Sequence, residues 1–161
     1  MNKKIILISA LSLIALIIAW SLISPLFLNK IVNESLPITQ QENIKNSEEN
    51  AQPPAPIETE RRGIFTDADA FHKTSGEARI LTINEKRYLS LENFKTTNGP
   101  DLYVYLSTDK ESTEFINLGK LKGNIGNQNY EIPENADVTK YNRVVIWCRA
   151  FSVLFGSAEL K

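Results

Sequence analysis

Apolar positions along the chain follow two different patterns, and a polar stretch separates them. Residues 5–28 form a run of 24 consecutive residues without a charge. Residues 63–161 carry short runs of β-forming residues with turn residues between them. The pattern therefore divides the chain into three parts, residues 1–29, 30–62 and 63–161.

The first part, residues 1–29, predicts one N-terminal transmembrane helix. Its uncharged run exceeds the roughly 20 residues that cross the hydrocarbon core of a bilayer. The apolar stretch of a cleaved secretory signal is shorter, about 7–15 residues, and ends in a site of small residues. The best such site, Ala19-Trp20-Ser21, lies inside the run, since apolar residues continue to Phe27. We predict an uncleaved signal anchor, with a cleaved secreted form as the alternative.

Charges that flank this segment predict its orientation. The amino terminus, Lys3 and Lys4 precede the run, whereas only Lys30 follows it closely. Because the more positive flank stays in the cytoplasm, we expect a single-pass protein of the cell membrane with its N-terminus inside. The rest of the chain is then extracytoplasmic.

The second part, residues 30–62, predicts a disordered linker. It is rich in Pro, Gln and Glu, and it contains neither glycine nor an aromatic residue. Such a segment buries too little apolar surface to offset its ordering entropy. We expect a flexible spacer, and a short helix at residues 30–35 is the only regular structure considered.

The third part, residues 63–161, predicts an antiparallel β-sandwich or barrel-like domain of about seven strands. In residues 102–106 aliphatic residues alternate with tyrosines, as in a strand with one buried face. In residues 144–148 both faces are apolar, which predicts a central strand covered on both sides. Helical turns are expected only at residues 67–71 and 137–141. The predicted strands are residues 78–83, 88–94, 102–107, 115–118, 129–132, 144–148 and 152–160.

Charge and motifs exclude several functions. The net charge is −1 at pH 7 and no part is strongly basic, so the electrostatic signature of a nucleic-acid-binding protein is missing. The segment Gly123-Asn124-Ile125-Gly126 is interpreted as a β turn. There is no Gly-rich phosphate loop, and one histidine with one cysteine cannot form the usual zinc site. A stand-alone enzyme is therefore disfavoured.

Cys148 is the residue with the most informative context. An exported chain with one cysteine cannot form an internal disulfide, so the thiol is free, joined to another protein or bound to a ligand. Periodicity places Cys148 on the face of Val144 and Ile146, with Arg149 on the other face. Two interpretations stay open. Cys148 is either a small core residue, or a thiolate that needs a positive neighbour and access to a partner.

His72 is the only imidazole available as a partner for Cys148 or for a haem iron. It lies just before the first predicted strand. A histidine in such a loop is either a hydrogen-bonding turn residue or a ligand, and the sequence leaves both open.

Several separated motifs of the third part occur together and in order. They are Gly63-x-Phe65, His72-x-x-Ser75-Gly76-x-Ala78, Gly99-Pro100-Asp101, Val144-Val145-Ile146-Trp147-Cys148 and Phe151-Ser152-Val153-x-Phe155-Gly156-x-Ala158-x-Leu160. With these motifs, residues 63–161 resemble the electron-transfer DM-thirteen domain family.

The resemblance implies an extracytoplasmic all-β domain with one characteristic cysteine, here Cys148, that works in redox chemistry. This cysteine would act as a bare thiol or hold a prosthetic group such as haem. His72 would be a second ligand or base, and Trp147 would pack beside the site. The remaining motif residues are expected to be structural. They are Ser75, Gly76, Gly99, Pro100 and Asp101, of which the last three would form a tight turn.

Together these observations predict a membrane-anchored extracytoplasmic redox or electron-transfer module that uses Cys148. Its electron partner would be a separate protein, because the haem-binding modules that often accompany this domain are not expected in the chain. The alternative is a tethered, non-catalytic binding or structural β module of the cell envelope, in which Cys148 is a core residue.

Overall fold

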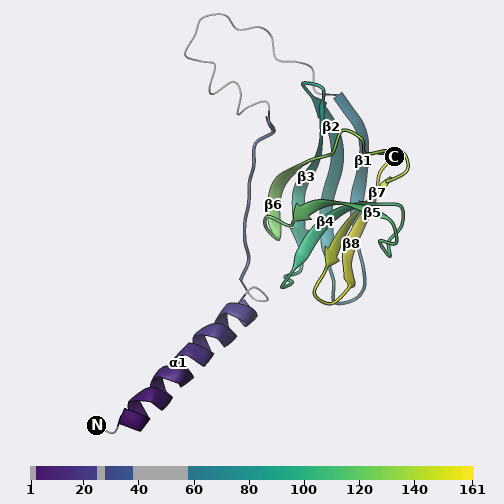
Figure 1. The fold of residues 1–161 in the computed structure, drawn as a ribbon. Coiled ribbons are helices and arrows are strands. Elements are labelled where there is room, and N and C mark those ends of the chain that lie inside the picture. The colour runs from purple at the N-terminus through teal and green to yellow at the C-terminus, as the bar shows by residue number, and fades with distance from the viewer. Residues whose placement is uncertain (1–2, 25–27, 38–57) are drawn as a thin grey trace, which may run out of the picture.

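The computed structural model describes residues 3–24, 28–37 and 58–161, which form an N-terminal helix and a β domain (Figure 1). Helix α1 spans Lys3–Ile23. Apolar side chains are exposed on every side of α1, since consecutive residues such as Leu16, Ile17 and Ile18 all face outward. Among the described residues, no helix is both long and apolar enough to cross a membrane.

Eight antiparallel strands form one sheet that curls into a nearly closed barrel (Figure 1). The strand order is β5-β4-β7-β8-β1-β2-β3-β6, so β5 and β6 are the edges. The predicted all-β antiparallel class is confirmed, with eight strands in place of about seven. The strands are β1 (Glu58–Asp67), β2 (Thr74–Ile83), β3 (Lys86–Thr96), β4 (Leu102–Ser107), β5 (Phe115–Lys120), β6 (Ile125–Glu131), β7 (Arg143–Cys148) and β8 (Val153–Glu159).

Strand β1 is the strand that the sequence pattern missed. It pairs with β2 in its first part and with β8 in its last part, and so joins the two halves of the barrel. Only Gly63 and Phe65 of β1 are buried, so charged residues hide its alternation. A Cβ atom on Gly63 would lie 2.2 Å from the carbonyl oxygen of Glu159, which shows how closely β1 approaches β8. Strand β1 also begins inside the predicted linker.

Strands β4 and β7 supply the centre of the core. Val104 and Leu106 of β4 face inward with Val144 and Ile146 of β7, as the alternation predicted. Val145 points to the other side of β7 and is also fully buried, so the prediction of a strand covered on both faces is confirmed. Of the two predicted helical turns, residues 137–141 form a hydrogen-bonded turn and residues 68–71 a bend.

Residues 29–35 run alongside β6, and we call this segment the strap. The N–H of Val32 donates to the carbonyl of Ile125 at 2.9 Å, and the N–H of Ile125 donates to the carbonyl of Lys30 at 3.3 Å. This is a parallel bridge, centred on Ile31 and Ile125. The first part of the predicted linker is thus extended and hydrogen-bonded, and the short helix considered at residues 30–35 is wrong. Residues 38–57 of that linker lie outside the described residues.

Two glycines of β6 and the preceding loop make room for the strap. A Cβ atom would lie 2.4 Å from the Lys30 carbonyl oxygen if placed on Gly123, and 2.0 Å from the Val32 carbonyl oxygen if placed on Gly126. Gly126 also has a φ of +105°, which other residues rarely adopt. The segment that the sequence suggested as a β turn is therefore the place where the strap meets the sheet edge.

One strap carboxylate ties the segment to β6 through two partners. Both oxygens of Glu34 lie 2.8 Å from Nζ of Lys122, and one of them accepts the N–H of Asn129 at 2.9 Å. The side chains of Glu34 and Lys122 are both half-buried. This contact therefore protects an amide of β6 that would otherwise face solvent at the sheet edge.

We predict that Glu34→Gln speeds hydrogen exchange of the Asn129 amide by about fivefold, because a charge-assisted hydrogen bond worth about 1 kcal/mol at this half-exposed site is lost. NMR exchange measurements on the full-length protein report this rate. The matched control is Glu131→Gln, which removes an exposed ion pair with Lys86 at the end of β6. Unchanged Asn129 exchange in Glu34→Gln would contradict the structural role of the strap.

Candidate functional site

The predicted site residues gather at one end of the barrel, which we call the proximal end. Successive antiparallel strands place the loops at residues 68–73, 97–101, 121–124 and 149–152 at the same end. The strap begins there as well, since Asn29 contacts Asn98 and Asn124 of two of these loops. In Figure 1 this is the end of the domain that lies next to helix α1.

Cys148 is the last residue of β7 and is buried in the core at the proximal end. It is 0% exposed, and it pairs with Leu102 of β4 and Val153 of β8. It belongs to the same core cluster as Val144 and Ile146, so its predicted phase is confirmed. A thiol in this position has no direct contact with solvent.

The Gly99-Pro100-Asp101 loop is fastened to the residue that follows Cys148. The N–H of Arg149 donates to the carbonyl of Asp101 at 3.0 Å, and Nε of Arg149 lies 3.2 Å from Oδ2 of the same residue. Lys120 adds a longer ion pair, with Nζ 3.6 Å from Oδ1 of Asp101. Asp101 therefore holds the end of β7 against the start of β4.

Phe155 connects three of the motifs. Its ring lies 4.3 Å from the His72 ring, measured between centroids. A Cβ atom on Gly99 would come within 2.9 Å of the Phe155 ring and 2.8 Å of the Leu102 side chain. Because Leu102 is the direct neighbour of Cys148 on β4, the His72 loop, the Gly99 loop and Cys148 belong to one packed region.

His72 is held in place by Asp69. Oδ2 of Asp69 lies 2.7 Å from Nδ1 of His72, while Oδ1 accepts the N–H groups of Phe71 at 2.7 Å and His72 at 2.8 Å. The hydrogen bond with the His72 ring, followed by those two backbone N–H groups, lowers the pKa of Asp69 to about 2. His72 therefore serves as a hydrogen-bonding residue of this loop.

Ser75, Gly76 and Gly156 shape the backbone of the same region. Gly76 has a φ of +113° at a register shift between β2 and β3, and Ser75 is exposed beside it. A Cβ atom on Gly156 would lie 2.4 Å from the Thr74 side chain, whose hydroxyl donates to the carbonyl of Phe155 at 2.8 Å. Gly76 and Gly156 thus have structural roles in the backbone of this region.

Trp147 lies on the other face of β7 from Cys148. It pairs with Tyr103 of β4 and Leu154 of β8 and is half-buried. Neighbouring residues of a strand point to opposite faces, so Trp147 does not pack beside the Cys148 thiol as the sequence suggested. Arg149 stacks 4.4 Å from the centre of the Tyr103 ring, which gives this outer face an aromatic and basic character.

The residues present do not fit a haem held by Cys148. An iron ligand needs an open coordination position, whereas Cys148 is enclosed by core residues and the pocket lined by His72 does not include it. Within the described ranges, no three His, Cys, Asp or Glu side chains lie close enough to hold a metal ion.

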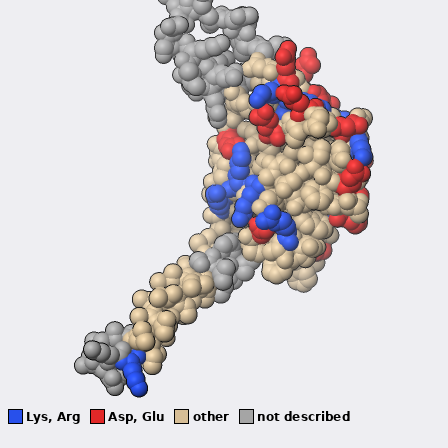
Figure 2. Space-filling model, in the orientation of Figure 1, with Lys and Arg blue, Asp and Glu red and all other residues tan. Residues whose placement is uncertain are grey.

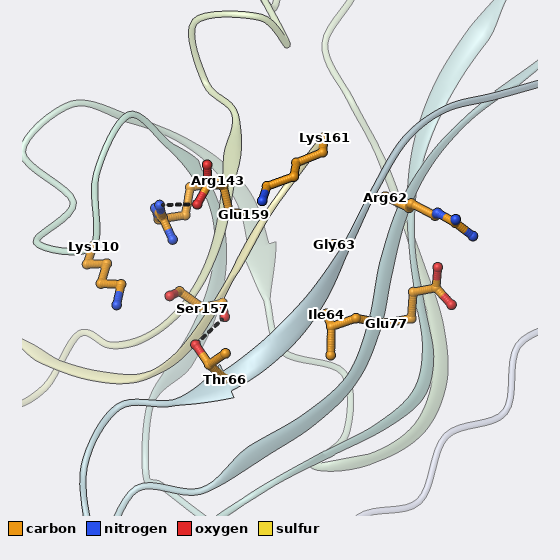
Figure 3. Close-up of a pocket in the computed structure, with 10 residues that line it drawn as sticks. All are labelled: Arg62, Gly63, Ile64, Thr66, Glu77, Lys110, Arg143, Ser157, Glu159 and Lys161. Carbon is orange, nitrogen blue, oxygen red and sulfur yellow. Dashed lines mark hydrogen bonds and ion pairs between the residues drawn. The ribbon is translucent and has the colours of Figure 1, made fainter.

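A hollow of about 920 Å³ lies over β1 and β8, and sequence reasoning missed it (Figure 3). Its basic residues come from four separate parts of the chain, so no motif could show them. Arg143 of this hollow is already paired with Glu159 at 3.3 Å. The hollow is wide, and the side chain of Glu159 is half-exposed at its wall. Its basic residues are Arg62, Lys110, Arg143 and Lys161.

We predict that the His72 loop loosens in acid. Because folding lowers the pKa of Asp69, its carboxylate stabilises the folded loop at pH values above the usual pKa of 3.8. This stabilisation disappears as the pH falls through the folded-state pKa of about 2. NMR shifts and exchange of the Phe71 and His72 amides should report the change. Asp69→Asn should abolish it, whereas Asp137→Asn, which alters another turn held by a carboxylate, should not. An acid transition that persists in Asp69→Asn would refute this assignment.

One of three comparisons with known proteins found a match. A family model described as "Electron transfer DM13" matches residues 65–160, which include every strand from β2 to β8 and most of the motif residues described above. Searches of curated proteins and of solved structures gave no match. Because the family model covers more than half of the chain, this protein belongs to the electron transfer DM13 family.

Proposed function

We propose that this protein is a membrane-tethered, extracytoplasmic electron-transfer module whose redox group is the thiol of Cys148. The observation that carries the proposal is the convergence of the family's separated motifs on the proximal end of the barrel. There the His72 loop, the Gly99 loop and the end of β7 pack against one another around Phe155 and Leu102.

Tethering to the membrane rests on the N-terminal segment. Residues 5–28 carry no charge, and the described part of α1 exposes apolar side chains all round. A helix that is apolar on every side is stable when an apolar medium surrounds it. The basic residues Lys3 and Lys4 precede it, which favours a cytoplasmic N-terminus and an extracytoplasmic β domain.

A single thiol limits the chemistry to exchange with another molecule. The chain has one cysteine, so a separate redox protein has to supply the disulfide. The Cys148 thiolate would attack one partner sulfur, a mixed disulfide would form, and the second partner sulfur would leave as a thiolate. Because Cys148 is enclosed, the β7–β8 end of the barrel has to open locally before this exchange.

A second candidate function follows from the complete burial of Cys148. In this case the domain is a tethered, non-catalytic binding module of the cell envelope, and the thiol only fills the core. Free cysteine is among the most buried residue types. Cys148→Ala would then lower the free energy of unfolding by about 1 kcal/mol and have no other effect.

The accessibility of the thiol in the native protein separates the two functions. For the electron-transfer module we predict that Cys148 of the full-length protein in detergent forms a mixed disulfide with glutathione disulfide. The rate of mixed-disulfide formation should not change as denaturant is added at low concentrations, because local opening is enough to expose the thiol. Mass spectrometry after acid trapping measures this rate. A preparation made with haem available should show no Soret band, and a band that Cys148→Ala removes would contradict the enclosed site.

The matched control is the double variant Val144→Cys/Cys148→Ala. It places the thiol on the same inner face of β7, equally buried but away from the proximal end. Its modification should follow global unfolding and rise steeply with denaturant. If Cys148 reacts with the same denaturant dependence as this control, the redox function is wrong and the binding module is supported.

A further inference from the structure

The proximal end of the barrel carries exposed aromatic residues that the fold does not require. Phe71 is 84% exposed at the tip of the β1–β2 loop, and Phe151 is 69% exposed in the β7–β8 loop. Leu28, just before the strap, is exposed as well. Large apolar side chains gathered at one end of a soluble domain mark an interaction surface.

Charge is distributed unevenly between the two ends of the domain. The four proximal loops, the strand residues next to them and the strap hold six basic and four acidic side chains, while the rest of the described β domain holds nine basic and twelve acidic ones. Figure 2 shows basic side chains gathered next to the helix, with most acidic ones farther away. The six basic residues counted at the proximal end are Lys30, Lys73, Lys95, Lys120, Lys122 and Arg149.

Part of this positive charge is not neutralised within the protein. Asp67 pairs with Lys73, Asp101 pairs with Arg149 and Lys120, and Glu34 of the strap pairs with Lys122. Lys30 and Lys95 are exposed and have no acidic partner within ion-pair distance among the described residues. An excess of positive charge around exposed aromatic rings fits a negatively charged, partly apolar surface.

The strap keeps this end of the domain close to helix α1. Helix α1 ends at Ile23 and the strap begins at Asn29, so the chain between them spans at most roughly 20 Å. The undescribed residues 38–57 follow the strap and do not lengthen this connection. If α1 is anchored in a bilayer, the proximal end lies within that distance of its surface.

We propose that the proximal end docks on the anionic phospholipid surface of the membrane that holds α1. Phe71 and Phe151 enter the interface between headgroups and acyl chains, and the surrounding lysines contact the headgroup phosphates. The inference rests on the membrane tethering in the proposed function. It adds an orientation, in which the Cys148 end faces the membrane and the acidic end faces away.

The test uses the full-length protein in nanodiscs of phosphatidylcholine, with and without phosphatidylglycerol. A gadolinium chelate attached to lipid headgroups broadens the NMR signals of nearby amides. We expect strong broadening at Phe71 and Phe151 in the anionic discs, less in the neutral discs, and little at the Asn84–Glu85 turn of the opposite end. High salt should weaken the effect, since it screens the charges.

The double variant Phe71→Ser/Phe151→Ser should lose this broadening, while Ile64→Ser, which removes an apolar residue of β1 about as exposed as Phe151, should retain it. Equal broadening at both ends, or broadening unchanged in the double variant, would overturn the docking surface. Protection of the two loops in lipid-free detergent that rises with protein concentration would assign the surface to a second copy of the chain, and so would also overturn it.

A separate measurement distinguishes failure of the tether from failure of the docking surface. The full-length protein is bound to phosphatidylcholine vesicles, washed at alkaline pH and floated on a density gradient. Protein that is washed off shows that α1 does not anchor the chain, which overturns the proposed tether and the docking that rests on it. Protein that stays on the vesicles while its loops remain unbroadened in anionic nanodiscs overturns the docking surface alone.

Discussion

The structure depends on how the unpaired backbone N–H and C=O groups at the open edge of β6 find hydrogen-bond partners. An eight-stranded sheet that does not fully close leaves N–H and C=O groups unpaired at its edges, and such groups attract other chains. Here the strap pairs with them, and the close approach is allowed by glycine at positions 123 and 126. Because the strap follows α1 almost directly, the same hydrogen bonds decide which end of the barrel lies beside the helix. They thereby connect the edge of the sheet to the orientation of the whole domain.

Close backbone packing also explains several glycines of the sequence motifs. At Gly63, Gly99 and Gly156 a Cβ atom would lie less than 3.0 Å from a neighbouring strand, ring or side chain. Gly63 lets β1 approach the last residue of β8, Gly99 and Gly156 bring the loops of the proximal end together, and Asp101 fastens the end of β7. Cys148 differs from these residues, because it lies fully buried in the core cluster and carries the one thiol of the sequence. Its burial fits a packing role, and its place beside the proximal loops fits the proposed redox role.

Regular alternation allowed most strands to be predicted from the sequence. Residues 102–107 were assigned with the bounds of β4, and the phase of Cys148 was correct, because a strand with one buried face has a period of two. Strand β1 was missed because it buries only two residues, and the strap was assigned to a disordered linker because its hydrogen bonds are to a partner far away in sequence. The position of His72 relative to Cys148 was equally hidden, since loop contacts fix it, whereas the placement of Trp147 on the opposite face follows from the same period of two.

The sequence by itself determined the β class, the inward phase of Cys148 and the family motifs, because these depend on local periodicity and on residue type. Only the tertiary structure decided that Cys148 is enclosed, that residues 29–35 belong to the sheet edge, and that four loops share the end next to α1. Each of these features results from contacts between residues far apart in the chain. No local pattern records such contacts, because their energy comes from surfaces that meet only after the barrel has formed.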